Sequence, residues 1–269
     1  MQRGRGGYTI IEVMVVLAVG LVTFLAAVSL LAGKQGKTEF SQAMRDVQTQ
    51  IQSVVNDVGV SNYPDAGSTE CRIGPDNRPR LVNDASPTGT GTNTQCIFLG
   101  KAIQLDNSTD PPHKLNVYTI VGRTKDASNQ TITDFNEANP SPIMGPPSDV
   151  NLTEDYTIPF SAAVLSAKED QQPDRETDLM GFYNSLQPTG PAAQGSQNLL
   201  AKGYAGFDSQ DATADVKAAI EDRMPGVTIV DSRRWTICFQ SGTSDEKAEL
   251  VVNISYSGVT TSLTYTDCS

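Results

Sequence analysis

The segment RGGYTIIEVMVVLAVGLVTFLAAVSLLAG, from Arg5 to Gly33, decides how this chain is organised. Within it, the twenty residues from Val13 to Ala32 carry no charge and include no proline. As an α-helix, a segment of this length measures about 30 Å, which is the thickness of the hydrocarbon core of a bilayer. The sequence therefore predicts a membrane-spanning helix near the N-terminus, preceded by a short basic segment, residues 1–7.

Glu12 is out of place at the start of this apolar run. An acidic side chain deep in a bilayer costs about 2.5–3.5 kcal/mol or more. A helix that served only as an anchor would carry an apolar residue at this position. We therefore expect Glu12 to have a partner of opposite charge.

The helical pattern continues beyond the span. Gly33 and Gly36 weaken the helix, but apolar residues then recur at steps of three and four, with polar residues between them. Gly59 follows the last of them and suits a helix end. The sequence predicts one long helix from Tyr8 to about Val58, whose second half packs on a globular domain through this stripe: Phe40, Met44, Val47, Ile51, Val54, Val55 and Val58.

The residues GGYTIIEVMVVLAV resemble the N-terminal processing signal of type IV pilins and pseudopilins. The resemblance covers roughly the first 30 residues. It implies that a prepilin peptidase cuts between Gly7 and Tyr8 and methylates the new N-terminus at Tyr8, which leaves Glu12 as the acidic residue of the mature helix. Tyr8 stands where phenylalanine is usual, Ile10-Ile11 stands where leucine-isoleucine is common, and the helix lacks the proline of many major pilins.

The resemblance also supplies the expected partner of Glu12. Cleavage creates a charged α-amine at Tyr8, and this amine in one subunit can pair with Glu12 of a neighbour. In a low dielectric such a pair offsets much of its desolvation cost, whereas an unpaired charge is strongly penalised. The pairing would fix the stagger between helices, and repetition of that single contact builds an open helical filament.

Two alternatives remain for the N-terminal segment. It could be an ordinary secretory signal cleaved near Ala32, or a plain signal anchor. Glu12 and the length of the apolar run are unfavourable for the first of these. The combination of basic leader, glycine, aromatic residue, threonine, apolar pair and glutamate favours the prepilin interpretation.

The four cysteines all follow the apolar segment, at Cys71, Cys96, Cys238 and Cys268. No CxxC pair is present and His113 is the single histidine, so no metal site is expected. An even number of cysteines in an exported domain favours two disulfides. We favour Cys71–Cys96 and Cys238–Cys268, because each pair closes one local loop, worth about 3–4 kcal/mol in the chain-entropy model.

The remainder of the chain predicts an exported, β-rich domain. A helix is expected over 210–224, with Ser209 or Asp211 as N-cap and Pro225-Gly226 as its end. Loops are expected over 61–93, 124–155 and 168–178. Alternating apolar patterns predict strands over 95–105, 116–122, 156–167, 179–186, 227–231, 234–240, 249–257 and 259–267. A tight turn at Ser257-Gly258 is expected between the last two of these strands.

Few residues suggest chemistry beyond assembly. The net charge of −11 is unfavourable for nucleic-acid binding. No GxSxG motif is present, and we expect His113 to lie exposed in a loop. Trp235 is expected to be a core residue. The acidic loops 149–155 and 169–178 could hold Ca²⁺, but they lack ordered ligand spacing and are expected to be solvated.

Together these observations predict an α+β fold, with a long N-terminal helix whose outer half packs on an antiparallel sheet. The expected divisions are a leader (1–7), a transmembrane assembly helix (8–33), its amphipathic continuation (34–59) and an exported head (60–269). We expect no enzyme activity and no cofactor. We expect a minor type IV pilus subunit that moves from the inner membrane to a surface filament, with other pilins, the prepilin peptidase and the assembly machinery as partners. The alternatives are a pseudopilin of a type II secretion or DNA-uptake system, and a membrane-anchored binding protein or enzyme.

Overall fold

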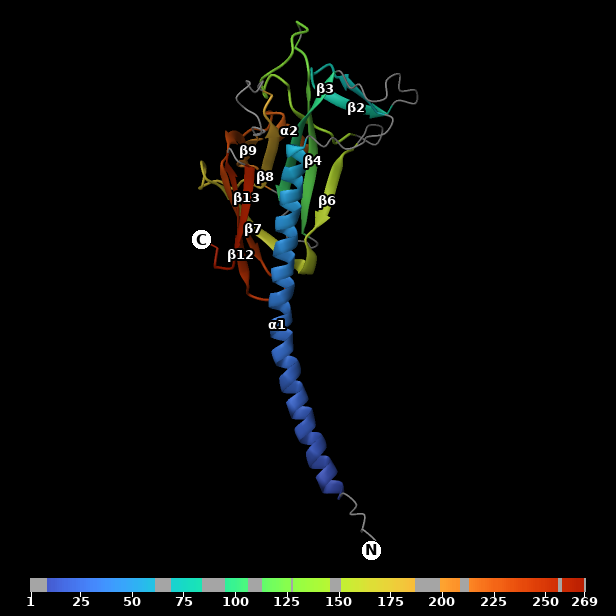
Figure 1. The fold of residues 1–269 in the computed structure, drawn as a ribbon, viewed down its shortest axis with the longest axis vertical. Coiled ribbons are helices and arrows are strands. Elements are labelled where there is room, and N and C mark those ends of the chain that lie inside the picture. Colours follow the sequence, from blue (N-terminus) through green and yellow to red (C-terminus); the bar gives the residue numbers. More distant parts are fainter. Residues whose placement is uncertain are drawn as a thin grey trace.

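The structure is a computed structural model that describes residues 9–60, 69–83, 95–105, 113–126, 128–145, 151–186, 199–208, 213–255 and 258–268. It consists of one long helix and a β-rich domain, here called the head. The head packs against the outer half of that helix (Figure 1). The α+β class predicted from the sequence is confirmed.

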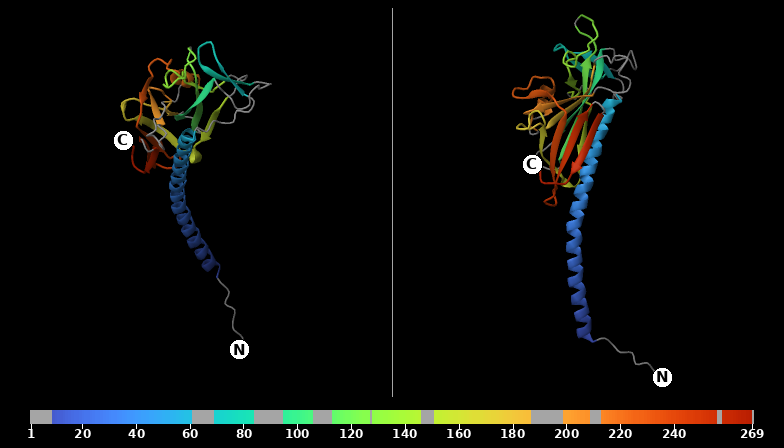
Figure 2. Two further views of the ribbon diagram at one scale, coloured as in Figure 1. Left: turned by 45° about the horizontal axis from the view of Figure 1, so that its top comes forward. Right: turned by 60° about the vertical axis from the view of Figure 1, so that its left-hand side comes forward.

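Helix α1 is continuous from Ile10 to Gly59, as the sequence predicts. Its N-cap is Thr9, and Gly33 and Gly36 do not interrupt it. The apolar stripe of the outer half is buried without exception: Phe40, Met44, Val47, Ile51, Val54, Val55 and Val58. The inner half extends away from the head, and its described side chains are exposed (Figure 2).

The head contains a two-stranded hairpin and two larger antiparallel sheets. The hairpin is formed by β1 (Thr69–Ile73) and β2 (Pro79–Asn83). The seven-stranded sheet has the order β10-β9-β8-β3-β4-β5, with β6 also paired to β4. Its strands are β3 (Cys96–Leu105), β4 (Lys114–Arg123), β5 (Ser141–Pro142), β6 (Thr153–Thr157), β8 (Leu179–Asn184), β9 (Leu199–Ala205) and β10 (Thr228–Asp231).

The four-stranded sheet has the order β13-β12-β11-β7. Its strands are β7 (Ala163–Glu169), β11 (Arg234–Gln240), β12 (Lys247–Ser255) and β13 (Gly258–Thr264). One apolar core joins α1 to both larger sheets, and it includes Phe182 and the predicted core residue Trp235, whose rings meet edge to face with centroids 5.5 Å apart. A second core, around Tyr204, includes the buried side of helix α2 (Thr213–Ile220).

The prediction of a loop over 61–93 is wrong for residues 69–83, which form the β1–β2 hairpin. The strands have only five residues each, and turn-forming residues separate them. Asn77 takes a left-handed conformation there, with φ 62°. Cys71 of β1 and Leu81 of β2 are buried in a small core with Cys96, Val121 and Ile143, and a local pattern does not reveal these long-range contacts.

The predicted strand over 156–167 is in fact two strands in different sheets. Pro159 begins a 3₁₀ turn (Pro159–Ser161) that separates β6 from β7. Proline has no N–H to donate to a ladder, and Phe160 and Ser161 both have positive φ, so the chain turns here and passes from one sheet to the other.

Other predicted elements need smaller corrections. The structure has two larger sheets where one was expected, and β10 pairs with the unpredicted strand β9 and not with the C-terminal strands. The expected loop over 124–155 contains β5 and the start of β6. Helix α2 ends at Ile220, short of the predicted 224, and its proposed caps Ser209 and Asp211 lie outside the described residues, as does Ser257 of the predicted tight turn.

The outer half of α1 is also held to the head by a buried cation. Lys101 of β3 has a side chain only 4% exposed, and its Nζ donates to Asp57 of α1 at 2.9 Å and to Glu154 of β6 at 3.2 Å. Burial lowers the pKa of Lys101, but the two carboxylates outweigh this effect and the pKa is raised overall. The stabilisation is therefore complete below the ordinary lysine pKa and is lost only as the pH rises through the folded-state value.

We predict that Lys101→Met lowers the free energy of unfolding by about 1–3 kcal/mol at neutral pH, because the hydrogen bonds to charged partners are lost. Lys37→Met is the matched control. Its ion pair with Glu246 is exposed, so a loss below about 1 kcal/mol is expected. Urea unfolding followed by fluorescence of the single tryptophan measures both variants. Equal losses would contradict the assignment.

Candidate functional site

The inner half of α1 is the feature of the structure that most clearly requires a partner. Residues Ile10–Val28 form a helix long and apolar enough to cross a membrane, with mean hydropathy 2.6 and no part buried inside the structure. Thirteen large apolar side chains in this range are each at least 45% exposed. Leaving such a surface in water costs on the order of 20 kcal/mol. This helix therefore belongs in lipid or among other helices.

The helix begins with a local cap that positions Glu12. The backbone N–H of Glu12 donates to Oγ1 of Thr9 at 3.3 Å. The Glu12 side chain lies in the first turn and is exposed. A carboxylate in the first turn is favoured by the helix dipole. Gly7 and Tyr8, the predicted cleavage and methylation positions, lie outside the described residues.

Among known families, the prokaryotic N-terminal methylation motif matches residues 2–28. The chain carries a type IV pilin-like prepilin signal. The match covers the leader, the predicted cut and most of the apolar helix, and it ends where the candidate span ends. No curated protein and no solved structure is significantly similar to the chain.

The prepilin signal explains how the molecule is oriented relative to the membrane. A helix with this signal anchors the protein in the membrane, and the prepilin peptidase and other pilins are the partners that such a signal implies. The head lies at the other end of the same helix (Figures 1 and 2). Because α1 is continuous, the position of the head relative to the membrane segment is set by the helix itself.

Hydrogen bonds from the outer half of α1 also hold the helix to the head. The hydroxyls of Ser41 and Tyr265 are 2.8 Å apart, and Nε2 of Gln48 donates to the carbonyl and the hydroxyl oxygens of Thr261. Tyr265 follows β13 and Thr261 lies within it. The C-terminal part of the head therefore holds the N-terminal helix directly.

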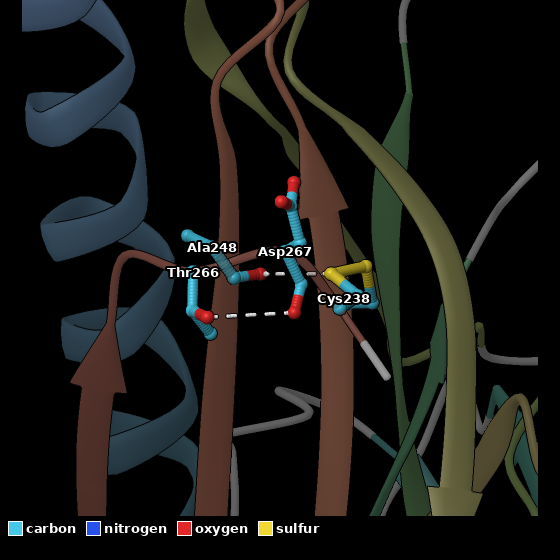
Figure 3. The surroundings of a disulfide bond; sticks show 5 residues. Cys238, Ala248, Thr266 and Asp267 are labelled. Carbon is cyan, nitrogen blue, oxygen red and sulfur yellow. Dashed lines mark hydrogen bonds between the residues drawn. A yellow bond between two sulfur atoms is a disulfide. The ribbon is translucent and has the colours of Figure 1, made fainter.

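Both disulfides lie in the head. Cys71 of β1 is bonded to Cys96 at the start of β3, which ties the hairpin to the seven-stranded sheet. Cys238 of β11 is bonded to Cys268, which ties the C-terminus to the four-stranded sheet. Figure 3 shows this second bond next to Ala248, Thr266 and Asp267. These are the two local pairs that the cysteine spacing favours.

The other residues considered in the sequence do not converge on a reactive centre within the described part of the chain. His113 immediately precedes β4 and is partly buried, not exposed as expected, while Trp235 is in the core as expected. The segment 168–178 is not wholly exposed as predicted, because Glu169, Thr177 and Asp178 are buried. Carboxylate oxygens of Glu176, Asp178 and Asp208 lie within 4.8 Å of one another, an approach that local spacing cannot reveal.

We predict that each disulfide contributes about 3–4 kcal/mol, because each closes a loop, with separations of 25 and 30 residues. The double variants Cys71→Ser/Cys96→Ser and Cys238→Ser/Cys268→Ser should each lose about this amount in urea unfolding. Non-reducing peptide mapping of the wild-type chain checks the connectivity. A peptide linking Cys71 to Cys238 or Cys268 would disprove it.

Proposed function

We propose that this protein is a minor structural subunit of a type IV pilus or a closely related filament, without enzyme activity, assembled through its N-terminal helix. The observation that supports this most strongly is the exposed apolar half of α1, which coincides with the matched methylation motif. The size of the head and its long connections favour a minor over a major subunit. In this proposal residues 1–7 are the leader, 8–33 the assembly helix, 34–59 its continuation and 60–269 the exported head.

Assembly would begin with cleavage after Gly7 at the cytoplasmic face of the inner membrane. The new α-amine of Tyr8 is methylated and keeps its positive charge. It then pairs with Glu12 of a neighbouring subunit, while the apolar side chains of the two helices pack together as they leave the lipid. The head is carried out to the cell surface on its own helix.

The relative energies explain why both features are needed. The apolar side chains favour a non-aqueous environment by on the order of 20 kcal/mol, so Glu12, at about 2.5–3.5 kcal/mol, does not prevent insertion. Apolar packing between helices is, however, tolerant of sliding. A charge pair in low dielectric is not, because an uncompensated charge is penalised. Glu12 thus sets the register, and the apolar residues supply most of the driving force.

Mass spectrometry of the mature protein tests the processing step. We expect a chain that begins at N-methylated Tyr8, and we expect Gly7→Phe to leave the leader attached and the protein in the membrane. A mature chain that begins near Gly33 would mean that the segment is an ordinary secretory signal, and the filament proposal would be abandoned.

Glu12→Val tests the assembly step. Insertion should persist or improve, because a cost of about 2.5–3.5 kcal/mol is removed. Processing should also persist, since the residues at the cut are unchanged. The fraction of processed protein in sheared filaments should fall sharply relative to the membrane fraction.

Thr38→Val, a polar-to-apolar change on the exposed side of the outer half, serves as the matched control and should assemble normally. Unchanged incorporation of Glu12→Val at normal expression would contradict the proposed role of Glu12.

A further inference from the structure

The junction between the two larger sheets contains a buried glutamate. Glu169 is the last residue of β7, in the four-stranded sheet, and it is only 1% exposed. Gly203 of β9, in the seven-stranded sheet, lies directly against it. A Cβ atom added at Gly203 would be 3.0 Å from Cγ of Glu169 and 2.7 Å from Oγ of Ser232. The missing side chain at Gly203 therefore lets the two sheets approach closely around Glu169.

The segment around Thr177 closes this junction and is bonded to both sheets. The N–H of Thr177 donates to the carbonyl oxygen of Ala167 on β7 at 3.1 Å. The N–H of Gly206, just after β9, donates to the carbonyl oxygen of Glu176 at 2.8 Å. The Thr177 side chain lies at the same point as Glu169, because its Cγ2 would be 3.4 Å from a Cβ at Gly203.

The polar groups gathered at this point have no hydrogen-bond partners within the part of the chain that the structure describes. They are both carboxyl oxygens of Glu169, the hydroxyls of Thr177 and Ser232, and the indole N–H of Trp235. Trp235 is directly opposite Glu169 in the ladder between β11 and β7, so the two side chains project from the same face of the sheet. A buried polar group without a partner is destabilising, and a charged one is much more so.

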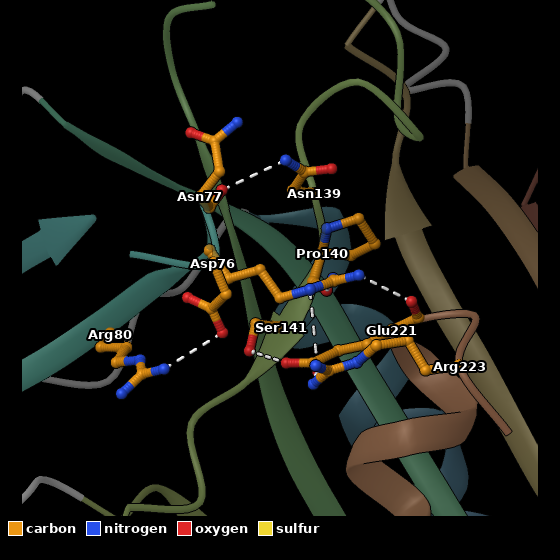
Figure 4. A network of polar contacts seen from close by, with 9 residues as sticks. Asp76, Asn77, Arg80, Asn139, Pro140, Ser141, Glu221 and Arg223 are labelled. Atoms are coloured by element: carbon orange, nitrogen blue, oxygen red, sulfur yellow. Dashed lines mark hydrogen bonds and ion pairs between the residues drawn. The ribbon is translucent and has the colours of Figure 1, made fainter. Parts of the chain in front are cut away.

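Another buried carboxylate in the head shows the usual compensation. Glu221 forms ion pairs with Arg223 and, at 3.7 Å, with Arg78. Ser141 donates its hydroxyl to Oε1 of Glu221 at 2.7 Å (Figure 4). The charge of Glu221 can be buried because positive charge lies beside it.

Glu169 lacks such a counter-charge among the described residues. The charged group that acts on its carboxyl is Asp170, the next residue, which is negative. Lys202 precedes Gly203 in β9, so its side chain lies on the other face of that strand, where it pairs with Asp231 at 3.0 Å.

The other charged residues around the junction do not supply a counter-charge either. Lys168 projects from the opposite face of β7, because side chains alternate along a strand. Arg175 donates to the carbonyl oxygen of Gly226. Two arginines next to β11 or within it are exposed: Arg233 and Arg234. Two further carboxylates flank Thr177: Glu176 and Asp178.

These surroundings favour the neutral acid. Burial raises the pKa of the Glu169 carboxyl and Asp170 raises it further, while the nearby N–H of Gln171 and hydroxyl of Ser232 only partly oppose the rise. The folded head therefore binds this proton more tightly than the unfolded chain does. The stability that the proton contributes is complete below the ordinary glutamate pKa, and it is lost as the pH rises through the folded-state value.

We propose that a proton on Glu169 holds the junction of the two larger sheets closed, and that the junction loosens when this proton is lost. The neutral acid carries an O–H that the Ser232 hydroxyl can accept. The carboxylate instead requires water, and the side chains already crowd Gly203, so water reaches the charge only when the sheets separate. Trp235 belongs to the core shared with α1, so the change extends to the packing of the head on its helix. The proposal does not depend on the filament role of α1.

The test compares the full-length wild type with Glu169→Gln in detergent micelles, by urea unfolding from about pH 4 to about pH 9. The amide has the shape of the neutral acid and does not ionise. We expect the wild type to lose stability relative to the variant as the pH rises. Between the unfolded-state and folded-state pKa values of Glu169, its unfolding constant should increase by up to about tenfold per pH unit relative to the variant. Glu169→Met should show the same pH dependence and serves as the second variant if Glu169→Gln disturbs the fold.

The single tryptophan gives a second measurement in the native state. Emission of Trp235 should titrate with Glu169 in the wild type and should not do so in Glu169→Gln. Glu137→Gln is the matched control, because it removes an exposed carboxylate outside the strands, and its stability should follow that of the wild type at every pH.

A difference between the wild type and Glu169→Gln that stays constant with pH would overturn the proposal. A wild type that becomes the more stable protein at high pH would also overturn it, since the carboxylate would then be the favoured form. The same holds if Glu137→Gln alters the pH dependence as much as Glu169→Gln.

Discussion

The apolar half of α1 cannot remain in water, and the rest of the structure is arranged around this constraint. The same helix backbone continues through Gly33 and Gly36 into the stripe that forms part of the core of the head. The head is therefore not tethered by a flexible linker. Whatever fixes the depth and rotation of the inner half also fixes the position of the head, so the register that we propose for Glu12 would be transmitted along the full helix.

The head in turn is built to hold that helix firmly. Side chains from α1 share one core with both larger sheets, and Lys101 links the helix to β3 and β6 near its outer end. The two disulfides close the hairpin and the C-terminus onto the sheets. In the proposed assembly the subunit is pulled from the membrane through its helix, and these contacts would keep the head closed under that load.

The sequence predicts α1 well because both halves have long, strong patterns: an uncharged run and then a stripe with helical spacing. The strands 96–105 and 234–240 are also evident from alternation and β-branched residues. Strand β9 is missed because LLAKGYA contains two alanines, a glycine and a lysine, and it becomes a strand only between β8 and β10. The hairpin β1–β2 is missed because a disulfide and a buried Leu81 stabilise it, not local propensity.

The proposed assembly residue and the polar contacts of the head divide in the same way. Glu12 can be identified from the sequence because a charge in an apolar run is conspicuous wherever it occurs. The polar network of Arg78, Ser141 and Glu221 cannot, because these residues come from the turn of a hairpin, a two-residue strand and the position after a short helix. Only the fold brings them together.

The central claim is that Glu12 pairs with the Tyr8 amine of a neighbouring subunit. A cryo-EM structure of filaments that contain this protein tests it most directly. The account predicts a Glu12 carboxylate within about 4 Å of the methylated amine of an adjacent chain, in a helix bundle free of water. A Glu12 side chain that faces solvent, or that pairs only within its own chain, would contradict the account.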